Sequence, residues 1–218
     1  MFDWAKDEEK RRNAITFVET TQMLIDEEGL ENISIRKIAE KAGFHNSTIY
    51  LYFEDANQLI LLASQKYFNV YGRKLEALSG MAADPREKFL AIWRTFGETA
   101  FHRPHVFRNY FFGKHSNELT RIINQYYQLF PEEKPAYMDE IKEMYFGDNI
   151  FYRCLQTLKP LIGVESTSVR EDNVEMLNTI IVACLKQVLD QACADPSITE
   201  DQANDQLLRM IRHVVGIS

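Results

Sequence analysis

Glycine and proline are scarce, with 9 and 6 residues in a chain of 218. Antiparallel sandwiches and barrels need many tight turns, which these two residue types supply, so their scarcity argues against a protein of many short strands. The apolar fraction of 45% is sufficient for a buried core, which argues against a largely disordered chain. We therefore expect an all-α protein of one or two domains.

Cysteines and long apolar runs are also few. Cys154, Cys184 and Cys193 lie far apart, so the chain offers neither a disulfide framework nor a CxxC zinc or redox motif. The longest apolar run covers residues 180–185, whereas a membrane span needs about 20 residues. Residues 1–12 are charged where a secretory signal needs an apolar segment. We expect a cytoplasmic protein without a membrane partner.

Basic residues are outnumbered, with 25 lysines and arginines against 32 acidic residues and a formal net charge of -7. A protein that coats nucleic acid without sequence preference needs a basic surface, so this class is excluded. A local DNA-reading face is compatible with the overall acidity.

The pattern of apolar residues predicts three helices at the N-terminus. Apolar side chains recur at three- and four-residue intervals over residues 10–28. Ser34 is the expected N-cap of a second helix over residues 35–42, which a glycine ends. A third short helix follows, with Asn46 or Ser47 as its expected cap. Two short helices around a glycine turn form a helix-turn-helix.

The remainder of the chain is also helical by its apolar periodicity. We expect a domain boundary near residue 55, with the helix-turn-helix motif at about residues 34–53 of the first domain, 1–55, and a larger domain at 56–218. The whole chain is expected to contain about nine to ten helices. Those of the larger domain are predicted at residues 55–79, 85–102, 104–113, 117–130, 135–147, 149–158, 169–194 and 199–215, with a loop over 163–168.

A specific resemblance begins at residues 34–44, which read SIRKIAEKAGF, and continues with TIYLYF at 48–53 and with Leu59. This pattern resembles the DNA-binding domain of the TetR family of bacterial transcriptional regulators. The resemblance covers about residues 10–62. It implies an all-α regulator that is not an enzyme, with an N-terminal three-helix DNA-binding domain followed by a larger helical ligand-binding and dimerisation domain.

The recognition helix of a helix-turn-helix places its N-terminal residues in the major groove, where base edges present hydrogen-bond partners. Tyrosine hydroxyls and the N-terminus of the preceding helix can bind phosphates. The resemblance further implies that Arg36 reaches a guanine edge. The candidate DNA-binding residues are Ser34, Arg36, Lys37, His45, Asn46, Ser47, Thr48, Tyr50 and Tyr52.

One departure from the family concerns charge. The family commonly carries a lysine near position 56 that contacts the DNA backbone, whereas this chain has Ala56 after Glu54 and Asp55. Residues 1–56 contain seven basic and twelve acidic side chains. We expect modest affinity for DNA, unless Lys10, Arg11 and Arg12 fold onto the duplex and the acidic cluster over residues 26–31 points away from it. We also expect a weaker salt dependence of binding than that of strongly basic repressors.

Aromatic residues are concentrated between residues 89 and 152. They can form either a plain helical core or the wall of an apolar ligand cavity. Glu98 could place a carboxylate among rings and so bind a cationic apolar ligand. Because the chain's histidines lack accompanying ligands, we expect no metal and no cofactor. The candidate lining residues are Trp93, Phe96, Glu98, Phe111, Tyr126, Tyr127 and Tyr145.

The last two predicted helices, 169–194 and 199–215, carry apolar stripes that could form a four-helix bundle with a second copy of the chain or pack only on their own subunit. With the resemblance, this predicts a homodimeric repressor that binds a palindromic DNA operator. A small, largely apolar or aromatic effector would release it by moving the helix over residues 55–79. The alternatives are an adaptor that does not bind DNA and a helical enzyme, for which no nucleophile elbow or paired base is found.

Overall fold

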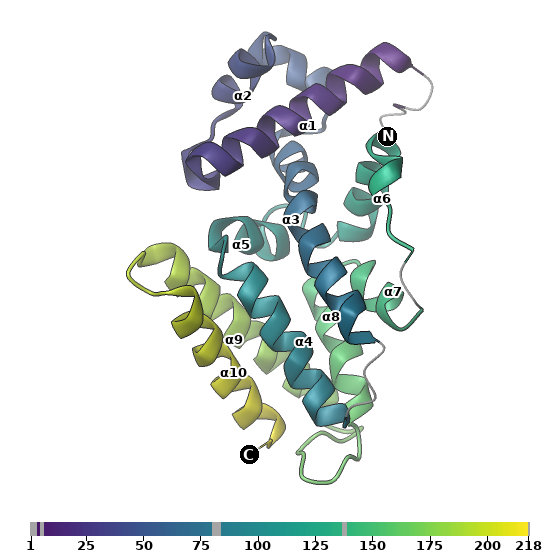
Figure 1. Cartoon of the computed structure of the whole chain (residues 1–218), viewed down its shortest axis with the longest axis vertical. Coiled ribbons are helices and arrows are strands. Elements are labelled where there is room, and N and C mark those ends of the chain that lie inside the picture. The colour runs from purple at the N-terminus through teal and green to yellow at the C-terminus, as the bar shows by residue number, and fades with distance from the viewer. Residues whose placement is uncertain (1–3, 5–6, 80–83, 137–138, 218) are drawn as a thin grey trace.

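The computed structural model describes residue 4 and residues 7–79, 84–136 and 139–217. This part of the chain is helical and contains no strand, which confirms the expected fold class. Figure 1 shows the N-terminal helices at one end of an elongated molecule and the remaining helices packed together at the other. No helix in the described ranges is both long and apolar enough to cross a membrane.

Side-chain caps set the first two helices. α1 (Glu8–Glu28) begins at Asp7, whose carboxylate accepts two backbone N–H groups at the helix start. α2 (Ile35–Ala42) begins at the predicted cap Ser34, which accepts the N–H of the third helical residue at 3.3 Å. Gly43 ends α2 with φ 79° and ψ 24°, a left-handed conformation that glycine adopts without strain.

The segment predicted as the recognition helix is the 3-10 helix η3 (Asn46–Leu51). His45 is its cap, because its Nδ1 accepts the N–H of Ser47 at 3.4 Å, so the prediction of Asn46 or Ser47 as cap was wrong. The segment has only six residues, which is too short to recover the cost of nucleating an α-helix, and its final turn closes with an i to i+3 hydrogen bond.

A cluster of rings holds these three helices together. Phe17 of α1 contacts Phe44, Tyr52 and Phe53, with ring centroids 4.7, 5.8 and 6.0 Å away. Phe17 and Phe53 are at most 1% exposed. Burial of each large apolar side chain stabilises the fold by about 1.5–3 kcal/mol, so this cluster fixes the position of η3 relative to α1.

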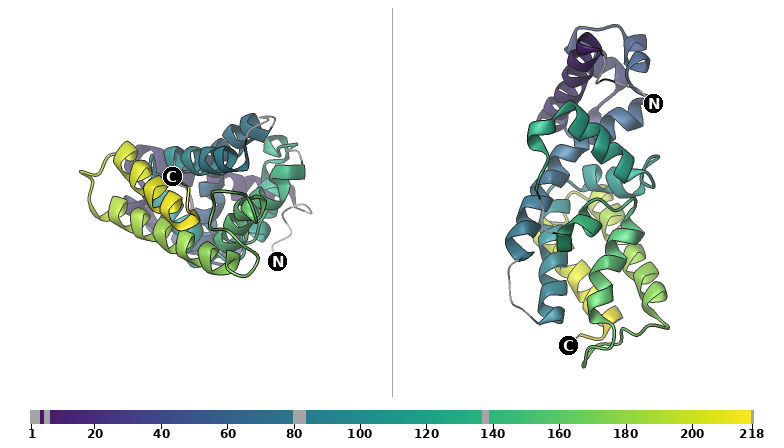
Figure 2. Two further views of the ribbon diagram at one scale, coloured as in Figure 1. Left: turned by 90° about the horizontal axis from the view of Figure 1, so that it is seen from below. Right: turned by 90° about the vertical axis from the view of Figure 1, so that its right-hand side faces the viewer.

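α3 (Ala56–Ser79) connects the two ends of the molecule. It packs against α1 and also against α4, α5, α6 and α7 of the larger body. The two views in Figure 2 show it leaving the N-terminal helices and entering the larger body. The other elements are η2 (Leu30–Asn32), α4 (Pro85–Ala100), α5 (Pro104–Phe112), α6 (Leu119–Leu129), η4 (Pro131–Glu133), α7 (Asp139–Tyr145), α8 (Ile150–Leu158), η5 (Lys159–Leu161), α9 (Val174–Ala194) and α10 (Glu200–Val215).

Most of these bounds agree with the predicted ones within a few residues; part of the helix predicted at 135–147 lies outside the described residues. The exception is α9, which begins five residues after its predicted start. The Asn173 carboxamide accepts the N–H of Arg170 and donates to the carbonyl of Ser168, both at 2.8 Å. These bonds close a turn that competes with helix over residues 169–173.

α10 packs against both α9 and α4 of its own chain. A Cβ at Gly97 of α4 would lie 1.9 Å from Asn204 Oδ1 of α10, so only glycine permits this close approach. The apolar stripe of α10, with Leu207 and Ile211 both at 0% exposure, is covered within the subunit. The exposed apolar surface is therefore found elsewhere.

Candidate functional site

The predicted DNA-binding residues gather around α2 and η3, whose residues contact each other. Tyr50 is 53% exposed and Thr48 is half-buried at the same helix. Leu51, which the sequence reading did not single out, is 65% exposed. An exposed leucine beside hydrogen-bonding groups can make an apolar contact with the methyl group that thymine presents in the major groove. The further exposed candidates here are Ser34, Arg36, His45, Asn46 and Ser47.

The structure gives two of the candidates other contacts. Tyr52 is only 8% exposed, and its hydroxyl accepts a hydrogen bond from Asn13 Nδ2 at 2.9 Å. It belongs to the ring cluster of the domain core, where it contacts Phe17 and Phe53. Lys37 is half-buried and its ammonium group pairs with Glu28 of α1.

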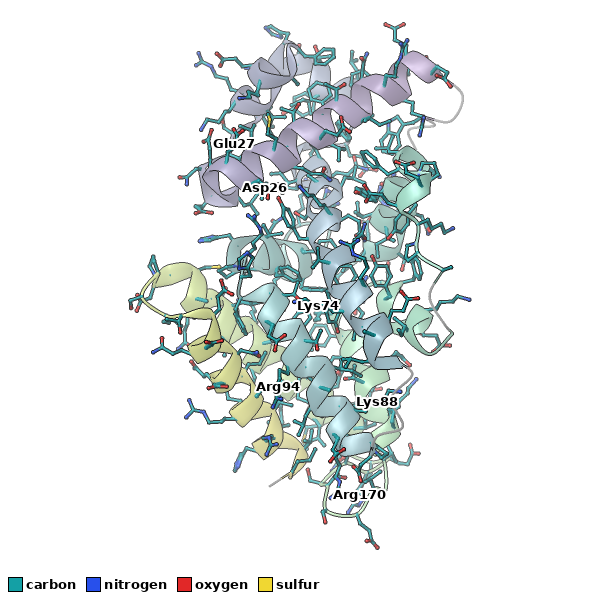
Figure 3. The ribbon with its side chains drawn as sticks, viewed as in Figure 1. Asp26, Glu27, Lys74, Lys88, Arg94 and Arg170 are labelled. Atoms are coloured by element: carbon teal, nitrogen blue, oxygen red, sulfur yellow. The ribbon has the colours of Figure 1, made fainter. Side chains whose placement is uncertain are left out.

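The acidic cluster at residues 26–31 is partly compensated by basic groups. Asp26 forms ion pairs with Lys66 and Arg103, each at 2.8 Å. Burial alone would raise the pKa of Asp26, but hydrogen bonds from Lys66 and Tyr67 outweigh it and lower that pKa. Figure 3 shows Asp26 at the end of α1 that faces the larger body. Its charge thus links α1 to that body.

Glu54 and Asp55 are also paired. Lys114 Nζ lies 2.6 Å and His115 Nε2 lies 3.1 Å from the Asp55 carboxylate, and Arg121 Nη1 lies 2.7 Å from Glu54. We call these five residues the junction cluster, because they join the start of α3 to the α5–α6 region. The two carboxylates suspected of weakening DNA binding are compensated by basic groups from the larger body.

The electrostatics of Asp55 follow from these contacts. Burial on its own raises the pKa of the Asp55 carboxyl, but hydrogen bonds from Lys114, from the backbone N–H of Gln58 and from His115 outweigh it and lower the pKa to about 2. The bond from Gln58, at 2.9 Å, also makes Asp55 the N-terminal cap of α3.

A small apolar cavity of about 30 Å³ lies between α3, α4, α5, α7 and α8. Four predicted residues line it: Trp93, Phe96, Phe111 and Tyr145. A second cavity of about 270 Å³ adjoins it. Ile92, Met144 and Thr157 line both cavities, while Phe68, Tyr71, Ile150, Arg153 and Cys154 complete the wall of the first.

Three predicted lining residues lie elsewhere. Glu98 is exposed on the outer face of α4, so it places no carboxylate among the rings. Tyr126 and Tyr127 are buried, but they hydrogen-bond to other groups: Tyr126 donates to Glu133 at 2.7 Å and Tyr127 donates to Asn69 at 2.9 Å. Helical spacing alone did not distinguish the cavity wall from the core around it.

The cavity wall is hydrogen-bonded to α3. The Tyr145 hydroxyl donates to Asn69 Oδ1 at 2.6 Å and accepts from Gln65 Nε2 at 2.8 Å. Tyr110 donates to Gln65 Oε1 at 2.5 Å. A buried polar network whose members are satisfied holds its parts in one arrangement. Any shift of Tyr145 is therefore passed to α3.

Arg153 is the charged group of the cavity, and the sequence reading missed it. Its side chain is 4% exposed, its Nε donates to the Gly147 carbonyl at 2.9 Å, and its guanidinium lies 4.6 Å from the Phe68 ring centroid. Burial lowers its pKa. The signal in the sequence was its spacing, because Arg153 shares a helix face with Ile150 and Thr157.

Comparison with known proteins concerns first the N-terminal helices that carry the predicted DNA-binding residues. Residues 17–63 match the family described as bacterial regulatory proteins, tetR family. The N-terminal domain belongs to the TetR family. An HTH-type transcriptional regulator of Staphylococcus aureus (strain USA300) is 35% identical to this TetR-family domain over 66 residues. The aligned segment covers 30% of this chain and 35% of that relative, so the chain matches about a third of the length of its curated relatives.

Solved structures extend the TetR-family likeness to the whole fold. RolR in complex with resorcinol is 17% identical, with a TM-score of 0.60 over 97% of this chain and 91% of that one. A TetR transcriptional regulator from Rhodococcus sp. RHA1 is 14% identical, with a TM-score of 0.52 over 95% and 97% of the two chains. The larger helical body thus has the TetR-type fold.

Proposed function

We propose that this chain is a ligand-responsive transcriptional repressor that acts in the cytoplasm. It binds a palindromic operator as a homodimer and is released by a small, largely apolar or aromatic molecule. The observation that carries this proposal is that one helix, α3, contacts both regions. The start of α3 is capped by Asp55 of the junction cluster, which follows η3 in the chain. In the middle of α3, Phe68 lines the cavity, and Gln65 and Asn69 hydrogen-bond to the wall residue Tyr145.

The DNA-binding part of the proposal rests on the exposed polar groups of α2 and η3. Thr48 and Tyr50 are the central residues, with the Ser34 end of α2 placed to accept a phosphate. His45 and Lys37 position neighbouring groups through their contacts with Ser47 and Glu28. Arg36, Asn46, Ser47 and Leu51 complete the proposed surface.

Selective DNA binding needs two copies of the chain, because one short recognition helix contacts too few base pairs to select a sequence. The structure offers an exposed apolar patch on α8 and α9, in which Phe151 is 46%, Tyr152 42%, Met176 58% and Ile180 39% exposed. Asn178 Nδ2 donates to the Phe151 carbonyl at 3.0 Å and so joins the two helices of the patch. We place the dimer contact on α8 and α9, with α10 at its edge.

Ligand release is proposed to act through α3. A molecule that enters the cavity displaces Tyr145, and its bonds to Gln65 and Asn69 transmit the displacement to α3 and hence to η3. Such a ligand weakens DNA binding only by the factor with which it prefers the non-DNA geometry. RolR, whose fold this chain shares, has been solved with the aromatic molecule resorcinol. The matched relatives are transcriptional regulators, which favours this function over an enzyme.

The test is selection of bound duplexes from a random pool, followed by titration of the enriched duplex at several salt concentrations. We expect one palindromic site bound by two chains. Tyr50→Phe together with Thr48→Ala should weaken binding by about tenfold or more, since a good base contact is worth about 1–3 kcal/mol. Recovery of no enriched sequence would favour the adaptor.

A further inference from the structure

We propose that the cavity recognises an anion: its ligand is a small aromatic or alicyclic carboxylate whose oxygens bind the Arg153 guanidinium. This inference rests on the proposed ligand-binding role of the cavity and names the chemical class of the ligand. The sequence suggested a cationic ligand bound by Glu98, whereas this proposal gives the ligand a negative charge. Glu98 is exposed on α4.

The first argument is that the charge of Arg153 is buried without compensation. Nη1 and Nη2 are both buried and have no hydrogen-bond partner in the described part of the chain. Asp148 attracts the guanidinium at longer range but forms no ion pair with it in that part. Burial raises the pKa values of the Tyr71 and Tyr110 hydroxyls; the nearby Arg153 guanidinium opposes this, at Tyr110 also through its polar contact with the hydroxyl, but both hydroxyls stay neutral and supply no negative charge. A buried charge is costly unless it is paired, so this arrangement lacks an anion.

The second argument is a further unpartnered donor in the same wall. The indole N–H of Trp93 is buried and has no hydrogen-bond partner among the described residues. The Tyr145 hydroxyl, by contrast, is already engaged with α3. Arg153 and Trp93 thus contribute unpartnered N–H donors to the wall, and a carboxylate supplies the matching acceptors. Its two oxygens fit the parallel N–H groups of a guanidinium.

The third argument concerns the remaining surface of the cavity. The guanidinium lies over the rings of Phe68 and Phe111, and Phe96 packs against Phe111 in the same wall, which matches an apolar body attached to the carboxylate. The cavity of about 30 Å³ is smaller than such a ligand, but only a few shared side chains separate it from its neighbour of about 270 Å³. Met144 is one of them, and methionine is flexible enough to move aside.

Other ligand classes fit less well. A cation would meet Arg153 with no carboxylate lining the cavity to balance it. A neutral phenol or amide would satisfy one donor but leave the charge uncompensated. Inorganic anions would leave the rings without a contact. An apolar carboxylate is the class that satisfies both the charge and the rings.

The experiment uses the full chain and matched pairs of probes: benzoate, phenylacetate and 2-naphthoate against the corresponding primary amides. Binding is followed by thermal shift and by tryptophan fluorescence, since Trp93 lies in the cavity wall and the chain has only 2 tryptophans. We expect the carboxylates to raise the Tm and the amides to bind at least about tenfold more weakly. Arg153→Met should remove the difference, and Arg153→Lys should retain part of it.

Arg94→Met is the matched control, because Arg94 is an exposed arginine of α4 that does not line the cavity (Figure 3). It should leave carboxylate binding unchanged. Amides that bind the wild type as well as the acids, carboxylate binding that survives in Arg153→Met, or a carboxylate panel without any effect would each overturn the proposal. Because the comparison of acid and amide is made on the wild type, it holds even where a variant fails to fold.

Operator binding measured on the same preparations separates this inference from the proposed function. DNA that is bound and then released by the neutral amides would leave the regulator standing and overturn the carboxylate class. Carboxylate binding that depends on Arg153, in a chain that selects no DNA sequence, would support the inference and contradict the proposed function.

Discussion

The junction cluster and the cavity both contain charged groups that are partly or wholly buried. The charges of the junction are paired with opposite charges, whereas the charge in the cavity is not. Asp55 has Lys114 and His115 within 3.1 Å, and Glu54 has Arg121 at 2.7 Å. Arg153 is more deeply buried, and its two terminal nitrogens have no partner in the described residues.

The difference teaches what each region is built to do. Paired charges at the junction satisfy one another, so they fasten the N-terminal domain to the larger body without a ligand. An unpaired charge in an apolar wall costs stability that only a bound anion recovers. A sequence shows the charges in both regions, but only the structure shows which of them are compensated.

The largest effect is expected from breaking the junction. Asp55→Ala removes the cap of α3 and leaves Lys114 and the buried His115 without their carboxylate. We expect a loss of about 3 kcal/mol in the free energy of unfolding, measured in urea. Asp7→Ala removes only an exposed cap at the start of α1 and should cost about 1 kcal/mol. Equal losses in the two variants would show that the junction contacts add nothing beyond the cap.

Acid should weaken the same contact. The pKa of Asp55 is lowered to about 2 in the folded chain, against about 3.9 for an unfolded aspartate. Its contribution is therefore fully present above about pH 5 and is lost as the pH falls toward 2, a loss of about 2 kcal/mol. The measurement is the free energy of unfolding of the wild type minus that of Asp55→Asn across this range. A difference that does not change with pH would contradict the paired junction.

The smallest effect has the opposite sign. Arg153→Met replaces an uncompensated charge by an apolar side chain of similar length, so the ligand-free protein should gain about 1 kcal/mol in stability. Arg121→Met at the junction should instead lose about 1 kcal/mol, because it leaves Glu54 and Glu118 without their partner. Thermal or urea unfolding of both variants without ligand compares them directly. A substantial loss in Arg153→Met would mean that Arg153 supports the fold itself.

The N-terminal region was largely predictable because its signals are local. The Ser34 cap, the left-handed Gly43 and the buried Ile49 are each set by neighbours within a few residues. The roles of Tyr50 and Tyr52 were not separable in this way. Two residues apart on a short helix, one is exposed and the other joins the rings around Phe17, which depends on the packing of α1.

The cavity was predictable only in outline. Trp93 and Phe96 were found because they lie in the aromatic-rich stretch 89–152, whereas Phe68 and Tyr71 lie outside it on α3 and were missed. Arg153 was missed because an arginine on an apolar helix face normally reaches solvent with its long stem. Here helices on all sides prevent that, and this depends on contacts distant in the sequence.

The unbroken length of α3 has a mechanical consequence. At about 1.5 Å per residue, its 24 residues form a rod of about 36 Å, and no proline interrupts it. The cavity residue Phe68 lies 12 residues, or about 18 Å, from the start of α3, so a tilt of about 5° at the cavity displaces that start by about 1.6 Å. In the proposed homodimer, recognition helices that read successive major grooves must be about 34 Å apart, so opposite displacements of this size in the two subunits would change that separation by about 3 Å. Under the proposed mechanism, a change too small to open the protein is therefore large enough to release the duplex.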